Sequence, residues 1–197
     1  MMEMKHLFEK ILELYHTGFR QDSDATCGPA SVILASQGLG IDMKSETEWL
    51  DKRLAQWMPV DQFPIRGMAL HELLFVSELI YGQTIEIKVR RAYRENFSLF
   101  QQDIKNSFLT MNAVLVANFR QDDFISTTFC ASGNPQYSPI IGWNENKNEL
   151  MVADVDPSLQ EPYWVTIDAL FQSMSHCNPA LGIPRGWLVL HKRLSTL

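Results

Sequence analysis

Apolar side chains recur at helical spacing through the first half of the chain. Leu7, Ile11 and Tyr15 lie three or four residues apart, which indicates an amphipathic helix. A second apolar segment begins near Cys27 and meets a helix stop signal at Gly38. The helices predicted in this half cover 3–15, about 27–37, 69–81, and a segment that opens with a capping-box pattern at Ser45 and runs toward Trp57.

The second half changes its period. Ile85, Ile87 and Val89 alternate with charged side chains, which is typical of a half-buried strand. Helices followed by antiparallel-type strands favour an α+β fold over a parallel βαβ sheet. No sequence repeat or Pro/Gly/Ser-rich linker divides the chain, so we expect one domain over 1–197. The strands predicted here cover 85–89, 113–119, 138–143, 149–155 and 186–190, and the helices cover 97–108 and 167–174.

The composition, with 46% hydrophobic and 20% charged residues over 197 positions, is that of an ordinary globular protein. A net charge of −6 argues against nucleic acid and anionic membranes as partners. No apolar run approaches the ~20 residues of a membrane span, and the N-terminal residues lack the pattern of a secretory signal. Three cysteines, Cys27, Cys130 and Cys177, cannot form a closed disulfide set. We therefore expect a reducing, cytoplasmic compartment and a free thiol.

Cys27 follows a polar loop and opens the second predicted helix. Backbone N–H groups at a helix N-terminus favour negative charge, so we expect a lowered pKa and a nucleophilic thiolate. Gly28 would let a substrate approach the backbone, and Pro29 fits a first helical turn. The alternative is that Cys27 is a small buried core residue, as most cysteines are. Gln21 could donate a hydrogen bond to an oxyanion formed at this thiol, although a solvated loop glutamine is the plainer interpretation.

Several segments between residues 20 and 192 carry a resemblance to a known family. They are Gln21 with Cys27-Gly28-Pro29-Ala30-Ser31, followed by 115–120, 137–142, 151–155, 162–165 and 185–190. In this order and spacing they resemble phytochelatin synthases, which are papain-like thiol transferases. The N-terminal segment and 154–157 are also similar to bacterial papain-like peptidases that cleave leader peptides.

The resemblance implies a papain-like fold, in which a helical lobe carrying the Cys helix packs against an antiparallel sheet. Members of the family attack the glycyl carbonyl of glutathione with the thiolate, release glycine and hold a γ-glutamylcysteinyl thioester. That acyl group then passes to another glutathione or to water. We expect no cofactor and no metal site on the chain, with heavy-metal thiolates of glutathione entering only as substrates.

The resemblance assigns roles to individual residues. Cys27 matches the nucleophile, Gln21 the oxyanion donor, and Asp154 the carboxylate that orients the catalytic histidine. The histidine position itself is Gln136, and an amide cannot take up a proton near neutral pH. Asp156 is a fallback for Asp154, because alternate residues of a strand point the same way. The plainer interpretation places both aspartates at a polar strand end.

The substrate side departs from the family pattern as well. Pro157 stands where the family has an arginine for the substrate carboxylate, and Gln160 stands at an aromatic position. We interpret each histidine as a surface or half-buried residue, and His176 beside Cys177 as weak evidence for a metal pair. The five histidines are His6, His16, His71, His176 and His191.

Three hypotheses follow. In the first, Cys27 forms a thioester with a γ-glutamylcysteinyl or other acyl substrate, and the missing base lowers the rate by about 10²–10⁴-fold. In the second, the chain is a pseudoenzyme that binds a peptide or small molecule. In the third, an α+β protein carries a chance Cys-Gly-Pro helix start. The expected partner is glutathione, a similar thiol peptide or another acyl substrate. We expect no nucleic acid or membrane partner. The sequence is compatible with a homodimer.

Overall fold

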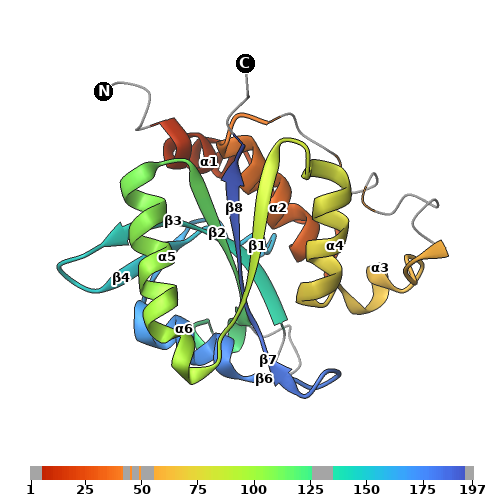
Figure 1. Ribbon diagram of the computed structural model, residues 1–197. Coiled ribbons are helices and arrows are strands. Elements are labelled where there is room, and N and C mark those ends of the chain that lie inside the picture. Colours follow the sequence, from red (N-terminus) through yellow and green to blue (C-terminus); the bar gives the residue numbers. More distant parts are fainter. Residues whose placement is uncertain (1–5, 42–44, 46–48, 50–55, 126–134, 194–197) are drawn as a thin grey trace.

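The computed structural model describes residues 6–41, 45, 49, 56–125 and 135–193 (Figure 1). Its helices are α1 (His6–His16), α2 (Cys27–Gly38), α3 (Phe63–Arg66), α4 (Leu70–Tyr81), α5 (Phe97–Thr110) and α6 (Ile167–Ser175), with short 3-10 turns η3 (Arg94–Asn96) and η4 (Gln121–Asp123). Its strands are β1 (Ile85–Arg91), β2 (Ala113–Arg120), β3 (Pro135–Asn144), β4 (Glu149–Val152), β5 (Tyr163–Thr166), β6 (Cys177–Asn178), β7 (Ile183–Pro184) and β8 (Gly186–Lys192).

Within the described residues, an antiparallel sheet of six strands lies at the centre, in the order β1-β8-β2-β3-β4-β5. The strand β8 pairs with β1 on one side and with β2 on the other, although it is the last strand in the sequence. The insertion of β8 therefore joins the two halves of the chain (Figure 1). The small β6-β7 ribbon forms a separate sheet.

Helices cover both faces of the central sheet (Figure 1). Along β2, Val114 and Val116 join a core that includes α1, α2 and α4, whereas Leu115 and Phe119 join a second core that includes α5 and α6. Because successive side chains of a strand point to opposite faces, β2 must be apolar at almost every position. The predicted α+β class, with N-terminal helices packed on an antiparallel sheet, is confirmed.

The helix α2 is buried from Cys27 to Gln37, between α1 and the sheet. The Ser31 hydroxyl donates a 2.7 Å hydrogen bond to the carbonyl oxygen of Tyr137, which attaches the helix to β3. At Gly38, an added Cβ would lie 2.6 Å from Cδ1 of Ile11, so glycine allows α1 to pack closely on α2. These contacts place the first turn of α2 over the beginning of β3.

The periodicity located most of these elements. The helices α1, α2, α4, α5 and α6 and the strands β1, β2, β3 and β8 each overlap a predicted segment. The predicted strand 149–155 is too long, because β4 ends at Val152 and a non-strand segment follows. The strand β5 was not predicted, since its four residues lie at the sheet edge and pair with β4 alone. The helix predicted from Ser45 lies mostly outside the described residues.

The described cysteines are free thiols, Cys27 buried and Cys177 exposed, which confirms the expected free thiol. Cys130 lies outside the described residues. Over the described ranges, no helix is both long enough and apolar enough to cross a membrane.

Candidate active site around Cys27

The structure brings the four predicted site residues together from three separate segments. Cys27 is the first residue of α2, Gln21 lies in the loop before it, and Gln136 lies near the start of β3. Asp154 follows the end of β4. The backbone N–H of Gln21 donates a 2.9 Å hydrogen bond to the carbonyl oxygen of Val155, so the loop before the helix is joined directly to the aspartate segment.

Cys27 lies against the backbone of β3, on either side of residue 136. Its Sγ is 4.0 Å from the carbonyl oxygen of Pro135, and the backbone N–H of Tyr137 lies close enough to the sulfur to favour its anionic form. The residue is only 6% exposed. The thiol is therefore adjacent to Gln136 but largely closed to solvent.

The lowered thiol pKa expected for Cys27 is wrong in this structure. The pKa of Cys27 is raised to about 12, chiefly by burial, and the charge of Asp154 acts in the same direction. Hydrogen bonds from the backbone N–H groups of Tyr137 and Gly28 lower the pKa, but they do not compensate for the loss of hydration. Thr26, which precedes the helix, makes no side-chain cap. Cys27 is thus a neutral thiol at neutral pH.

Asp154 is completely buried and is held by four hydrogen bonds from described residues. Its Oδ1 accepts from Nε2 of Gln136 at 2.7 Å and from the backbone N–H of Asp156 at 3.1 Å. Its Oδ2 accepts from the hydroxyl of Tyr163 at 2.8 Å and from Nε2 of Gln121 at 3.1 Å. Burial raises the pKa of Asp154, and these hydrogen bonds oppose the rise because they stabilise the carboxylate.

Gln136 connects Gln21 to Asp154. Its Nε2 donates to Oδ1 of Asp154 at 2.7 Å and to Oε1 of Gln21 at 3.2 Å, so both amide hydrogens are used. Gln21 in turn donates from its own Nε2 to the carbonyl oxygen of Ser23 at 2.9 Å. Each Nε2 carries two hydrogens, so as far as the described residues go the Gln21 amide retains one for an oxyanion. The chain of hydrogen bonds positions both amides, and neither amide can accept the proton of Cys27 near neutral pH.

Two members of this network were not predicted. Gln121, in η4, donates at 3.1 Å to carboxylate oxygens of both Asp154 and Asp156, so the two aspartates meet at one amide although their segment is not the strand that the sequence predicted. Tyr163, the first residue of β5, contributes its hydroxyl from the sheet edge. Its segment appeared only as part of a family resemblance, and a lone tyrosine or glutamine gives no local signal of a buried polar contact.

The described histidine side chains lie away from this network. His16 is 3.9 Å from a carboxylate oxygen of Glu161, and His176 is 3.8 Å from one of Asp123. His71 is exposed on α4, and His191 lines a cavity beside α5. His6 begins α1, and its side chain is outside the described set. Over the described side chains, no histidine hydrogen-bonds to Cys27 or Asp154.

Arg20 does not replace the substrate arginine that is absent at Pro157. Its guanidinium donates to the carbonyl oxygens of Leu159 and Gln160, at 3.0 and 3.1 Å, and to two further carbonyls, one in the last turn of α1 and one just after that helix. It also stacks on the Tyr15 ring, 3.5 Å from the centroid. These contacts hold the 157–160 segment in place and leave the guanidinium committed to the protein's own backbone.

The expectation that Gly28 admits a substrate is also wrong. An added Cβ at Gly28 would meet the Leu73 side chain at 3.2 Å and the Tyr137 ring at 3.4 Å, so this glycine serves packing in the core. In the described part of the chain, no three His, Cys, Asp or Glu side chains gather to hold a metal ion. His176 and Cys177 therefore have no third ligand among the described residues.

The sequence matches the phytochelatin synthase family over residues 2–187. Glutathione gamma-glutamylcysteinyltransferase 3 of Lotus japonicus is 22% identical over 190 residues, which cover 94% of this chain and 37% of that protein. The corresponding transferase of Schizosaccharomyces pombe is 23% identical over 175 residues, covering 86% of this chain and 40% of that protein. This chain thus spans about two fifths of the length of these curated relatives.

Among solved structures, a C39-like peptidase from Bacillus anthracis is similar, with a TM-score of 0.49 and 12% identity over 86% of this chain and 90% of that one. The family match extends over nearly the whole sequence and includes the segments of Cys27, Gln136 and Asp154. On that match, this chain belongs to the phytochelatin synthase family.

Proposed function

We propose that this chain binds a small thiol peptide of the glutathione type, or another acyl substrate, beside Cys27 without the rapid peptide cleavage that a Cys–His pair provides. The observation that carries the proposal is the Gln136 amide, which bridges Gln21 and Asp154 at 3.2 and 2.7 Å. An amide in this position can donate and accept hydrogen bonds, but it takes up no proton near neutral pH.

The electrostatics of the site support the same conclusion. Burial raises the pKa of Cys27 to about 12, so the nucleophilic thiolate is scarce at neutral pH. General acid–base assistance is worth about 10²–10⁴-fold in rate, and cleavage of an amide also requires a proton for the leaving amine. Glutathione as ligand rests on the family and on the transferases named above. The Pro157 and Gln160 positions leave the ligand's carboxylate contacts different from the family pattern.

A second function, slow acyl transfer from an activated donor, is favoured by one specific observation. Cys27 is the first residue of α2, its sulfur lies against the backbone of β3 at Pro135, and one hydrogen of the Gln21 amide has no acceptor within the described residues. In this reaction the thiolate attacks a thioester carbonyl carbon. Cys27 first gives up its proton to water, a new thioester then forms at Cys27, and the departing group leaves as a thiolate that takes up a proton from water afterwards. A thiolate leaving group needs no protonation, so the missing base matters less.

The Gln136→His variant tests these alternatives. A histidine at this position would place an imidazole between Asp154 and the Cys27 sulfur, so we expect glycine release from glutathione to rise by about 10²–10⁴-fold. Glycine is measured with and without cadmium, and intact-mass spectrometry detects an acyl group on Cys27. The matched control is Gln121→His, which offers an imidazole to the same Asp154 carboxylate from η4.

The unmodified chain should gain thermal stability with glutathione, as binding to the folded state requires, and should release no glycine. Glycine release by the unmodified chain at the rate of Gln136→His would contradict the proposal. An acyl adduct on Cys27 that forms from a thioester donor, but not from glutathione, would establish the second function instead. Neither stabilisation nor an adduct with either ligand would rule out both functions.

A further inference from the structure

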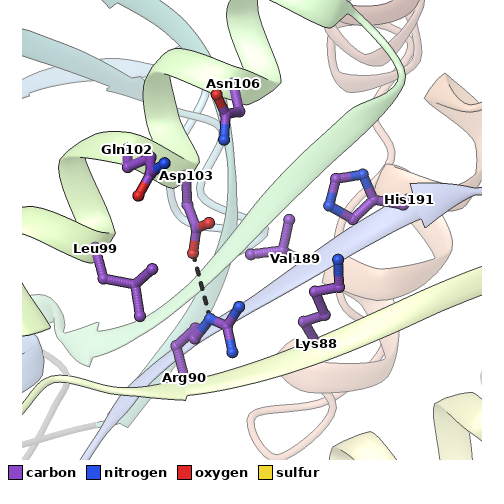
Figure 2. Close-up of a pocket in the computed structure, with 8 residues that line it drawn as sticks. All are labelled: Lys88, Arg90, Leu99, Gln102, Asp103, Asn106, Val189 and His191. Atoms are coloured by element: carbon purple, nitrogen blue, oxygen red, sulfur yellow. Dashed lines mark ion pairs between the residues drawn. The ribbon is translucent and has the colours of Figure 1, made fainter.

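A cavity separate from the Cys27 site lies between α5 and the strands β1 and β8 (Figure 2). Its volume is about 290 Å³. Val189 in its wall belongs to the core on the α5 side of the sheet, whereas Cys27 belongs to the core on the opposite side. None of the described residues that line the cavity belongs to the network around Asp154.

Basic groups from the two strands converge on this cavity. Lys88 and Arg90 come from β1 and His191 comes from β8, and α5 contributes the amides of Gln102 and Asn106 (Figure 2). Hydrogen-bond donors thus line both the strand wall and the helix wall. The protein as a whole carries a net charge of −6, so a local excess of basic groups stands out from its surface.

Asp103 is the acidic member of the cavity wall, and its charge is already engaged. Its Oδ2 accepts a 3.0 Å hydrogen bond from the indole N–H of Trp187 and lies 3.6 Å from Nε of Arg90. At 3.6 Å this ion pair is too long for a hydrogen bond, and the Arg90 Nε is buried without a hydrogen-bond partner among the described groups. A buried guanidinium nitrogen without an acceptor is costly, and an oxyanion in the cavity would supply one.

Lys88 is available for a ligand as well. Its ammonium lies 3.5 Å from a carboxylate oxygen of Glu86, but both side chains are more than 40% exposed, and such surface pairs contribute little. Among the residues of the cavity wall, the negative charge of Asp103 offsets the positive charge of Arg90, and the positive charge of Lys88 remains. Protonation of His191 would add a second positive charge. The wall of the cavity is therefore suited to an anion.

We propose that this cavity binds a small organic molecule through an oxyanion group, either a carboxylate or a phosphate. Lys88 and Arg90 bind the oxyanion, and Gln102 and Asn106 bind neighbouring hydroxyl or carbonyl groups. A cavity of about 290 Å³ is close to the lower limit for ligand sites, so it suits a small molecule better than a folded partner or a long peptide. The proposal is independent of the function assigned to Cys27.

His191 links this binding to pH. Burial lowers its pKa, and the charge of Lys88 lowers it further, followed by a smaller effect of Arg90, while Glu86 and Asp103 act in the opposite direction. On its other side, the facing residue of β2 is the uncharged Ala113. A bound anion would stabilise the imidazolium, so its pKa would rise and binding would tighten as the pH falls.

The test is calorimetric titration of the full chain with inorganic phosphate and, separately, with succinate at constant ionic strength. Saturable binding of either probe supports the site, and the tighter probe distinguishes a phosphate from a carboxylate ligand. Lys88→Gln should weaken binding by about tenfold, since it removes one charge-assisted contact. His191→Gln should leave binding at alkaline pH nearly unchanged and abolish the strengthening at acidic pH.

The matched control is Lys147→Gln, which makes the same change of charge in the exposed turn between β3 and β4, outside the cavity wall. Lys147→Gln should change affinity by less than about twofold, as expected for a distant screened charge. Equal weakening by Lys147→Gln and Lys88→Gln would show non-specific attraction and overturn the proposal. The absence of saturable binding for both probes would overturn it as well. The imidazole NMR signal of His191, assigned by its loss in His191→Gln, should move to a higher pKa with the bound probe.

Discussion

At the scale of single residues, the properties of Cys27 result from two opposed effects on one sulfur. The N-terminus of α2, with its free backbone N–H groups, favours the thiolate. This stabilisation of a negative charge is worth about 0.3–1 kcal/mol at an exposed helix N-terminus and up to ~2 kcal/mol when the charge is partly buried. Removing a charge from water costs several kcal/mol, which is larger. Because Cys27 is only 6% exposed, desolvation dominates and the thiol remains protonated.

This balance predicts the reactivity of the thiol. At pH 7, iodoacetamide should alkylate Cys27 far more slowly than the exposed Cys177, because only the thiolate attacks and access is restricted. The Cys27 rate should continue to rise as the pH approaches 12, the value to which burial raises its pKa. Mass spectrometry of the two cysteine peptides measures both rates in one sample, and the denatured chain is the control. Equal rates for the two thiols in the folded chain would contradict this assignment.

The same shift in pKa predicts a loss of stability in alkali. The unfolded chain loses its Cys27 proton near pH ~8.5, whereas the folded chain retains it until the pH approaches 12. The unfolded state therefore binds fewer protons in this window, so the free energy of unfolding falls as the pH rises through it. Cys27→Ala should remove this contribution, which urea titrations of both proteins at several pH values would measure. Identical pH dependence in the two proteins would argue against a buried neutral thiol.

At the scale of elements, the attachment of α2 to β3 brings Cys27 next to Gln136. The hydroxyl of Ser31 supplies a buried 2.7 Å hydrogen bond across this contact, to the carbonyl oxygen of Tyr137. Another buried serine of the same helix, Ser36, instead bonds within the helix to the carbonyl oxygen of Val32. Substituting each serine in turn therefore distinguishes a hydrogen bond that joins α2 to β3 from one that lies within α2.

We expect Ser31→Ala to lower the free energy of unfolding by about 1–2 kcal/mol, because a buried carbonyl loses its side-chain donor. Ser36→Ala should cost less than about 0.5 kcal/mol, since the Val32 carbonyl keeps its place in a regular helix. Denaturant titration measures both changes. If the Gln136→His variant is active, adding Ser31→Ala to it should lower that activity, whereas adding Ser36→Ala should leave the activity unchanged. The reverse order of effects would show that α2 is positioned by other contacts.

At the scale of the whole molecule, the two cores share the strands β2 and β8. Leu115 faces the core of α5 and α6, and Leu188 faces the core of α1, α2 and α4. Leu115→Ala and Leu188→Ala should each cost about 2–5 kcal/mol, as large-to-small substitutions in packed cores do. Because the strands are shared, each variant should shift a single unfolding transition, seen equally by circular dichroism and tryptophan fluorescence. Separate transitions would contradict the prediction of one domain over 1–197.

The amino-acid sequence by itself determined the local elements, because helical and strand periodicity depend on neighbours a few residues apart. The apolar runs of α4 and β2 and the polar loop before Cys27 each indicated the right local structure. The sequence also indicated that Gln21, Cys27, Gln136 and Asp154 belong to one site, through the family resemblance rather than through any local pattern. The structure joins them by hydrogen bonds and backbone contacts.

Only the tertiary structure decided what surrounds these residues. Gln121 lies 33 residues from Asp154 along the chain, and Tyr163 lies nine residues from it. Short-range sequence patterns do not predict contacts at these separations. The same holds for the insertion of β8 between β1 and β2, which also creates the wall of the basic cavity. The protonation of Cys27 depends on how completely packing excludes water from its sulfur. That exclusion is the sum of contacts from α2, β3 and their neighbours, so the type and order of residues near Cys27 could not reveal it.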